Sequence, residues 1–218
     1  MEHSTAWRIA NRFASLAPHQ RREFLHKMQE QGVSFGQLPI PATTPQDAPC
    51  ELSYAQQRQW FLWQLDPEGA AYHIPAALRL RGALNVPALQ RSFDVLVERH
   101  HSLRSVFIDQ PVTAFEGPAA LIADSGSDHR VLMALHDLRG FAQAERLNLA
   151  LHQVDQDIAQ PFDLQHGPLL RVSLLQLDTD DHVLVLTLHH IVSDGWSMGV
   201  LIEEFSQVYA AHAQGRDL

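Results

Sequence analysis

The spacing of apolar residues predicts five helices. Apolar positions recur every three or four residues over 18–32, 85–100 and 196–209, which predicts amphipathic helices there. Ser53 and Gln56 form a capping-box pair that predicts the start of another helix, ending near Asp66. A fifth helix is predicted over residues 142–160, because Pro161 cannot continue it.

Short apolar runs between these helices predict strands over residues 71–80, 105–109, 131–138, 169–177 and 182–190. The last of these strands is apolar in both alternating sets, which predicts a position in the middle of a sheet. Residues 111–130 mix Gly, Pro, Asp and Ser and are expected to form a loop. Helices alternating with strands indicate an α/β fold (α+β layered), with a mixed sheet flanked by helices.

A proline-rich stretch separates the first helix from the remaining elements. Four prolines between Pro39 and Pro49 are typical of an extended connector. We therefore expect three parts: a helical appendage or linker at residues 1–38, a connector at 39–50, and a domain at 51–218.

Composition excludes several classes of protein. The formal charge of −9 argues against a nucleic-acid-binding surface, which needs clustered Lys and Arg. The chain shows neither an apolar run of about 18 residues nor a signal-peptide pattern, so we expect no membrane partner. Cys50 is the single cysteine, which excludes an intramolecular disulfide and fits a cytoplasmic location.

The segment LHHIVSDGWS at residues 188–197 is the strongest candidate for chemistry. His189 and His190 end the apolar strand and face opposite ways, and a loop through Asp194 and Gly195 leads into a helix. We expect His190 to continue the face of Leu186 and Leu188 and to be suited to proton transfer.

This segment also has simpler explanations. A histidine at a strand end is more often a hydrogen-bonded core residue than a catalyst. Asp194 can act as a helix cap alone. A zinc site with His190 and Asp194 as ligands is a further alternative, but the sequence shows no third ligand nearby.

Two other stretches carry polar groups that need an explanation. Arg58 lies in a helix rich in apolar and amide side chains, where it either finds a buried partner or extends to solvent. ERHHSLRSVF at residues 98–107 places four basic side chains at a predicted helix end, where capping explains them without a function.

Together these stretches resemble, in order, the first three core motifs of the condensation domains of nonribosomal peptide synthetases. LSYAQQRQWFLWQLDP (52–67) is similar to the first motif and ERHHSLRSVF to the second. LHHIVSDGWS matches the family's His-His-x-x-x-Asp-Gly motif at every fixed position. The resemblance spans roughly residues 9 to 218.

The resemblance implies amide-bond formation between a donor acyl or peptidyl thioester and an acceptor aminoacyl thioester. It implies no bound cofactor or metal, because phosphopantetheine arms of donor and acceptor carrier proteins present both substrates. His190 falls on the catalytic position, as general base or as a group that positions the amine. His189, Asp194, Gly195 and Arg58 fall on positions held to be structural, with Asp194 orienting the loop through an ion pair.

Within the family, the first motif and Ser193 look most like the subtype that joins an L-donor to an L-acceptor. The chain departs from the family pattern at His101, where an acidic residue is usual, and in residues 110–130, which lack a Gly-x-Pro-x-Gln pattern. The family's domain has two chloramphenicol-acetyltransferase-like lobes, and residues 51–218 correspond to the N-terminal lobe alone.

The missing lobe implies that this chain is a fragment, inactive by itself, and we expect it to self-associate through uncovered surface. Its other expected partners are the second lobe and an adjacent adenylation domain. Three alternatives stay open: an epimerisation domain, another acyltransferase with the same motif, and a non-catalytic module that docks carrier proteins.

Overall fold

The computed structural model of this chain describes residues 3–41, 50–109, 118–122 and 130–216. The chain divides into two compact units, residues 1–46 and residues 47–218. The second unit is the larger and contains two β-sheets.

The first unit is a pair of helices, α1 (His3–Ser15) and α2 (Pro18–Glu30), followed by the short 3-10 helix η1 (Phe35–Gln37). The Phe13 ring contacts Phe24 and Phe35, with centroids 6.0 and 5.0 Å apart. The sequence pattern predicted α2 but not α1. Ala6, Ala10 and Phe13 of α1 also recur at helical spacing, and Ala6 and Ala10 are buried, so a local pattern for this helix was present in the sequence as well.

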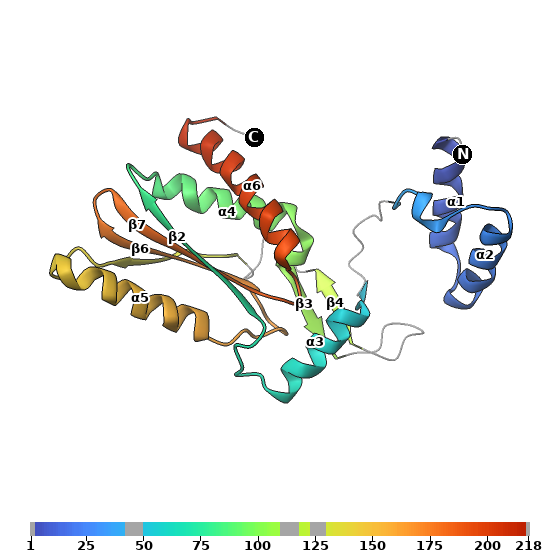
Figure 1. The fold of residues 1–218 in the computed structure, drawn as a ribbon, viewed down its shortest axis with the longest axis horizontal. Helices are drawn as coiled ribbons and strands as arrows, with labels where there is room; N and C mark the ends of the chain where they lie inside the picture. The colour runs from blue at the N-terminus through green and yellow to red at the C-terminus, as the bar shows by residue number, and fades with distance from the viewer. Residues whose placement is uncertain (1–2, 42–49, 110–117, 123–129, 217–218) are drawn as a thin grey trace. The chain divides into compact units, whose positions relative to one another are not determined.

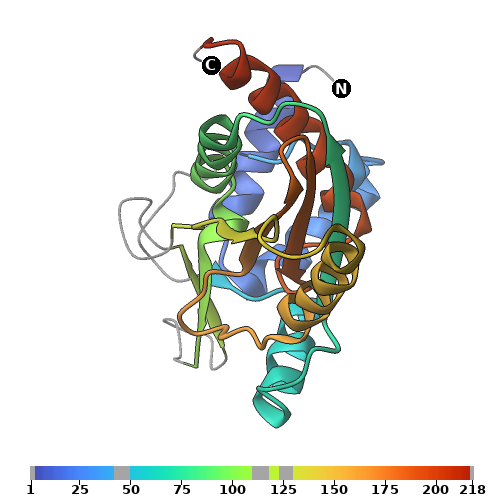
Figure 2. The same ribbon diagram turned by 90° about the vertical axis from the view of Figure 1, so that its left-hand side faces the viewer.

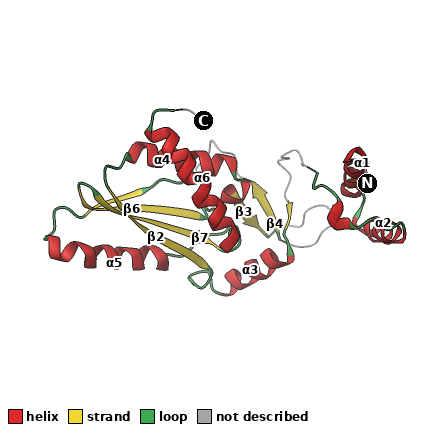
Figure 3. Ribbon diagram, turned by 45° about the horizontal axis from the view of Figure 1, so that its top comes forward, coloured by secondary structure: helices red, strands yellow, loops and turns green. Residues whose placement is uncertain are grey.

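The larger sheet of the second unit has the strand order β2-β7-β6-β5. These strands are β2 (His73–Arg81), β5 (Ala134–Asp137), β6 (Leu170–Asp178) and β7 (Asp181–His189). β5 and β6 are parallel and the other pairs are antiparallel, so the sheet is mixed as predicted. Figure 3 shows β7 between its neighbours, which confirms the central position predicted from its two apolar faces.

Helices cover both faces of this sheet, which explains why β7 is apolar on both sides. In Figures 1 and 2, α4 (Val86–Arg99) and α6 (Gly195–Ala213) lie across the sheet from α5 (Gln143–Ala159). The core beneath α4 and α6 includes Phe93, Leu184 and Leu188, and Val185 faces the core beneath α5. Within the described ranges, no helix is long and apolar enough to cross a membrane.

A smaller sheet lies beside α3 (Tyr54–Leu65) and consists of β1 (Cys50–Glu51), β4 (Ala119–Ile122) and β3 (Ser105–Ile108), in the order β1-β4-β3. The loop expected over residues 111–130 is therefore wrong at β4, whose pairing with β3 and β1 is a long-range contact that a local pattern does not reveal. Residues 111–117 and 123–129 of that expected loop lie outside the described residues.

The basic side chains at the end of α4 bind the carbonyl groups of that helix and a carboxylate of α6. Arg104, in the 3-10 helix η2 (His101–Arg104), is buried, and its Nε donates to the Val97 carbonyl at 3.0 Å. Arg99 and His100 both contact Glu204 of α6, at 3.1 and 2.8 Å. Capping, as the simpler interpretation predicted, and helix pairing thus account for Arg104, Arg99 and His100.

We expect Phe93→Ala to lower the free energy of unfolding by about 3–5 kcal/mol, because a buried aromatic side chain leaves a cavity. Phe93 is 1% exposed and stacks on Phe205 with ring centroids 4.8 Å apart. Phe141→Ala is the matched control, since Phe141 is 50% exposed and should cost less than about 1 kcal/mol. Urea denaturation followed by circular dichroism measures both, and equal losses would contradict this view of the core.

Candidate active site

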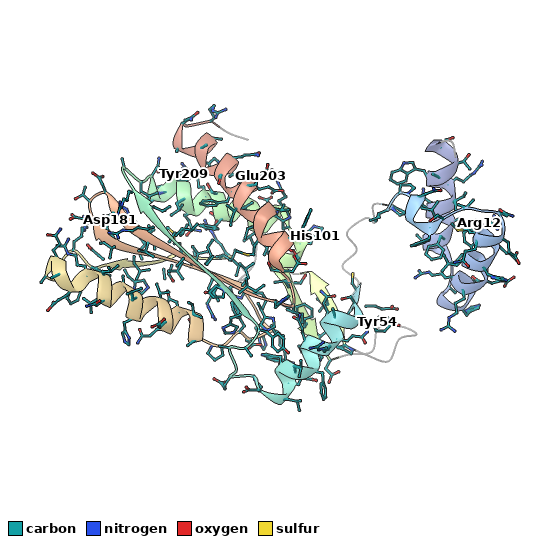
Figure 4. The ribbon with its side chains drawn as sticks, viewed as in Figure 1. Arg12, Tyr54, His101, Asp181, Glu203 and Tyr209 are labelled. Carbon is teal, nitrogen blue, oxygen red and sulfur yellow. The ribbon has the colours of Figure 1, made fainter. Side chains whose placement is uncertain are left out.

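The two histidines of the motif are held by backbone hydrogen bonds to the residues that immediately precede the strands on either side of β7. The His189 N–H donates to the Leu169 carbonyl at 3.2 Å, and the His190 N–H donates to the Tyr72 carbonyl at 2.8 Å. β7 ends at His189, and a short loop then leads to the first residue of α6, Gly195. The loop therefore begins from a backbone position fixed on both sides. Figure 4 labels Asp181, which lies at the opposite end of β7.

His189 is a core residue. Its side chain is 3% exposed, and its ring lies 6.0 Å from the Phe162 ring and 6.2 Å from the His73 ring. Its Nδ1 accepts a hydrogen bond from the Ile191 N–H at 3.1 Å, so the proton of the neutral ring lies on Nε2. Burial, with smaller contributions from His73 and His190, lowers the pKa of His189 from 6.5 to about 4.

His190 is exposed, in contrast to its neighbour, which confirms that the two side chains face different surroundings. The expectation that His190 continues the face of Leu186 and Leu188 is wrong. Those two leucines are buried in the core, whereas β7 ends at His189 and His190 is an exposed residue of the loop. The His190 Nδ1 lies 3.5 Å from the Nε2 atom of Gln59 on α3. An exposed imidazole at the end of a buried strand is available to a substrate.

Asp194 acts as the N-cap of α6. Its Oδ1 accepts hydrogen bonds from the Ser197 N–H at 2.8 Å and from the Ser197 hydroxyl at 2.6 Å. These two hydrogen bonds, of which the one from the hydroxyl has the larger effect, lower the pKa of the exposed Asp194 carboxyl. The carboxyl is therefore ionised at neutral pH. The helix-cap explanation is confirmed. In the part of the chain that the structure describes, Asp194 has no basic partner within ion-pair distance.

Gly195 and Arg58 differ in how they relate to the loop. A Cβ atom on Gly195 would meet no described atom within 4 Å, so the space in front of the start of α6 is open. Arg58 is exposed on α3, and no ion pair or hydrogen bond of its guanidinium is found among the described residues. Of the two explanations for Arg58, the structure supports extension to solvent.

The zinc alternative gains no third ligand from the fold. Among the described residues, no three His, Cys, Asp or Glu side chains lie close enough together to hold a metal ion. His190 and Asp194, the two ligands that the sequence offered for zinc, are both exposed.

The sequence interpretation missed the contacts by which α3 holds the loop. The Gln56 Oε1 accepts from the Ser53 N–H at 3.0 Å, which completes the predicted capping box, and its Nε2 donates to the Ile191 carbonyl at 3.3 Å. Gln59 lies three residues further on the same helix and contacts His190. The available signal was the pair of glutamines at positions i and i+3.

A second set of missed residues fixes the end of α5 beneath His189. The His73 Nδ1 donates to the Ile158 carbonyl at 2.7 Å. The Arg171 guanidinium lies 3.7 Å from the centre of the Phe162 ring and donates to the Pro161 carbonyl at 2.7 Å. Burial lowers the pKa of Arg171 to about 10, so it stays charged at neutral pH. These contacts position the Phe162 ring against His189.

A pocket of about 280 Å³ lies beside the loop, between η2 and the first turns of α6. Leu103 and Leu188 contribute apolar surface, Val192 belongs to the loop itself, and His100 is the basic residue of the lining. Trp196 also borders the pocket and is 84% exposed. The loop thus carries an exposed imidazole at His190 and, through Val192, also lines a largely apolar pocket, to whose lining His190 does not belong.

The comparisons with known sequences agree on one family. The sequence model of the condensation domain matches residues 46–218. Malpibaldin synthetase from Mortierella alpina is 47% identical over 167 residues, which make up 77% of this chain and 3% of that protein. A linear gramicidin synthase protein from Brevibacillus parabrevis is 40% identical over 214 residues, 98% of this chain and 2% of that protein.

Solved structures of condensation domains share the fold. The first condensation domain of the calcium-dependent antibiotic synthetase, in complex with a substrate analogue, has a TM-score of 0.68 and 30% identity. The starter condensation domain of rhizomide synthetase has a TM-score of 0.69 and 25% identity. Each match covers 78% of this chain and 39% of the solved chain, so this chain spans about two fifths of those domains.

The sheet, with helices on both faces, is the chloramphenicol-acetyltransferase-like fold expected from the resemblance. From its match to the family model and to synthetases from two organisms, we conclude that the chain belongs to the condensation domain family of nonribosomal peptide synthetases.

Proposed function

We propose that this chain is the N-terminal lobe of a condensation domain that forms amide bonds between substrates carried on phosphopantetheine arms. The observation that carries the proposal is the contrast between the two motif histidines: His189 is buried and neutral at the end of β7, whereas His190, the first residue after the strand, is exposed. The fold thus uses one imidazole to build the loop and leaves the other available for chemistry.

In the proposed reaction, the acceptor amine nitrogen bonds to the carbonyl carbon of the donor thioester. The carbon–sulfur bond breaks, and the proton lost by the amine ends on the released thiol of the donor arm. His190 is the catalytic residue, as the proton acceptor or as a hydrogen-bonding group that positions the substrate. No cofactor of the chain's own takes part, because the carrier proteins bring both reactants.

The other motif residues support the loop. His189 holds it through the Ile191 N–H, and Asp194 caps α6 through Ser197, so the loop is tied at both ends. Gly195 leaves the approach to the helix start open. Arg58 is proposed to be architectural, and its exposure makes it available to the remainder of the domain.

The remainder of the domain is the second proposed partner, beside donor and acceptor carrier proteins and an adjacent adenylation domain. The solved condensation domains are more than twice as long as the part that matches this chain. Phe61 and Leu65, four residues apart on α3, are 58% and 67% exposed, and Trp196 is also exposed. We propose that the second lobe covers apolar surface of this kind and completes the site, so that the isolated lobe is inactive.

We expect His190→Ala to abolish product in the natural two-lobe parent of this chain, supplied with two loaded carrier proteins. Loss of general acid–base catalysis typically costs about 10²–10⁴-fold in rate. Peptidyl product on the acceptor carrier, measured by mass spectrometry, is the readout. His152→Ala, at an exposed position of α5, is the matched control and should keep wild-type activity. Racemised substrate without amide product, or carrier binding without turnover, would instead favour an epimerisation domain or a docking module.

We expect His189 to make stability depend on pH. Its folded-state pKa is about 4, against 6.5 for the free side chain, so between these values the unfolded chain binds a proton that the folded chain does not. The free energy of unfolding should therefore fall as the pH drops from about 7 to about 5. In His189→Gln this pH dependence should be smaller, whereas His152→Gln, with an exposed histidine, should leave it unchanged. Urea denaturation at both pH values measures the change in the free energy of unfolding. The same change in the wild type and in both variants would show that His189 does not cause the pH dependence.

Self-association of the isolated chain is expected from the exposed apolar residues of α3. Replacing both Phe61 and Leu65 by Ser should lower the apparent mass in light scattering, because it removes that apolar area. Arg58→Ser is the control, since it changes an exposed polar residue of the same helix. A monodisperse wild-type monomer at high concentration would contradict the expectation.

A further inference from the structure

Two glutamine side chains of α3 make polar contacts with the catalytic loop, beside the apolar packing of Ile191 in the cluster that contains Trp60. Gln56 donates through Nε2 to the Ile191 carbonyl at 3.3 Å, and the Nε2 atom of Gln59 lies 3.5 Å from the His190 Nδ1. The spacing of three residues places both amides on one side of the helix. The first amide holds the loop backbone, and the second meets the imidazole proposed to carry the chemistry.

The position of Gln59 is restrained by two anchored tryptophans, Trp60 and Trp63, that follow it on α3. Trp60 is 2% exposed and stacks on Phe107 and on Trp63, with ring centroids 6.3 and 5.0 Å apart. The Trp63 indole N–H donates to the Phe162 carbonyl at 2.9 Å. The 3.5 Å separation is longer than the usual hydrogen-bond range of about 2.7–3.2 Å, and His190 is exposed at this contact.

The orientation of the Gln59 amide decides which nitrogen of His190 can carry the proton. The amide Nε2 is a donor, so the Nδ1 atom facing it must be the acceptor. The Gln59 Oε1 is buried without a hydrogen-bond partner among the described residues. Exchanging the oxygen and nitrogen of the amide would place its NH2 group at the buried position now held by Oε1. Two buried N–H donors without acceptors are less favourable than one buried carbonyl oxygen without a donor.

We propose that Gln59 is a positioning residue for His190: its amide N–H donates to Nδ1, so the neutral ring carries its proton on Nε2. In that tautomer, Nε2 is a hydrogen-bond donor and cannot accept a proton from the amine. Of the two roles left open for His190, the geometry favours donation of a hydrogen bond to the reacting groups. This inference rests on the proposed function.

Three ionisable groups lie on the elements that carry His190 and Gln59, and a test must separate their influence from that of the Gln59 amide. Asp194, the cap of α6, and His189, the preceding residue, both interact electrostatically with His190. Arg58, which precedes Gln59 on α3, is exposed. A substitution at residue 59 leaves all three of these groups in place, so its effect reports on the contact between the Gln59 amide and the His190 Nδ1.

The first test uses the 218-residue chain with 15N-labelled histidine, and it needs no turnover. Long-range 1H–15N correlation spectra report which ring nitrogen is protonated, and His190→Gln identifies the His190 signals by their absence. We expect the Nε2-protonated form in the wild type. Gln59→Glu should move the ring proton to Nδ1, because a carboxylate oxygen accepts a hydrogen bond from Nδ1–H. It should also raise the titration midpoint of His190 by about one pH unit.

The control is Gln64→Glu, which adds the same charge to an exposed position of α3. It should leave the tautomer unchanged and shift the midpoint less than Gln59→Glu does. Gln59→Leu, which removes the amide at similar size, should give a mixture of the two tautomers. An Nδ1-protonated wild type, or the same spectrum for Gln59→Glu and Gln64→Glu, would overturn the inference.

The second test measures condensation in the two-lobe parent. Gln59→Leu should lower kcat about tenfold with little change in the KM for the acceptor carrier, because it disturbs orientation rather than binding. Gln59→Glu should shift the pH dependence of kcat in the same direction as it shifts the NMR titration midpoint of His190. An expected NMR result without any wild-type product would reject the proposed function and leave the contact standing. Wild-type product with no effect of residue 59 would reject the positioning role alone.

Discussion

The structure depends on the hydrogen bonding of one strand on both of its edges. β7 pairs with β2 and with β6 along its length, and the segments adjoining these two neighbours also bind the backbone of His189 and His190. A strand held on both sides and covered on both faces cannot shift its register without moving its whole apolar set. The backbone at the end of β7 is therefore held in place, which fixes the position from which the following loop starts.

At this platform, burial separates two residues that are chemically identical. His189 enters an apolar and aromatic setting formed by Phe162 and His73, and the cost of burying a charge there keeps it neutral. His190 remains exposed next to the amide of Gln59. The helix cap at Asp194 and the amide of Gln56 then fix the rest of the loop, so each end of the motif has its own backbone anchor.

Much of the fold was predictable from local patterns. The two apolar faces of β7 placed it in the sheet interior, Pro161 ended α5, and Ser53 with Gln56 marked the start of α3. Two elements were missed for different reasons. α1 carries a local helical pattern that includes the buried Ala6 and Ala10 and was overlooked, whereas β4 lies in a polar, Gly- and Pro-containing stretch and owes its strand conformation to pairing with the preceding strand β3 and with β1, far earlier in the sequence.

The family motif, the capping residues and the layered arrangement follow from the sequence, because spacing and local hydrogen bonding act over a few residues. Which histidine is exposed, that Arg58 extends to solvent, and that Gln59 contacts His190 became known from the folded structure. Contacts such as this last one join residues 131 positions apart, and no local pattern encodes them. They arise when buried strands and anchored helices bring side chains to fixed places, where burial and hydrogen bonding then set their chemistry.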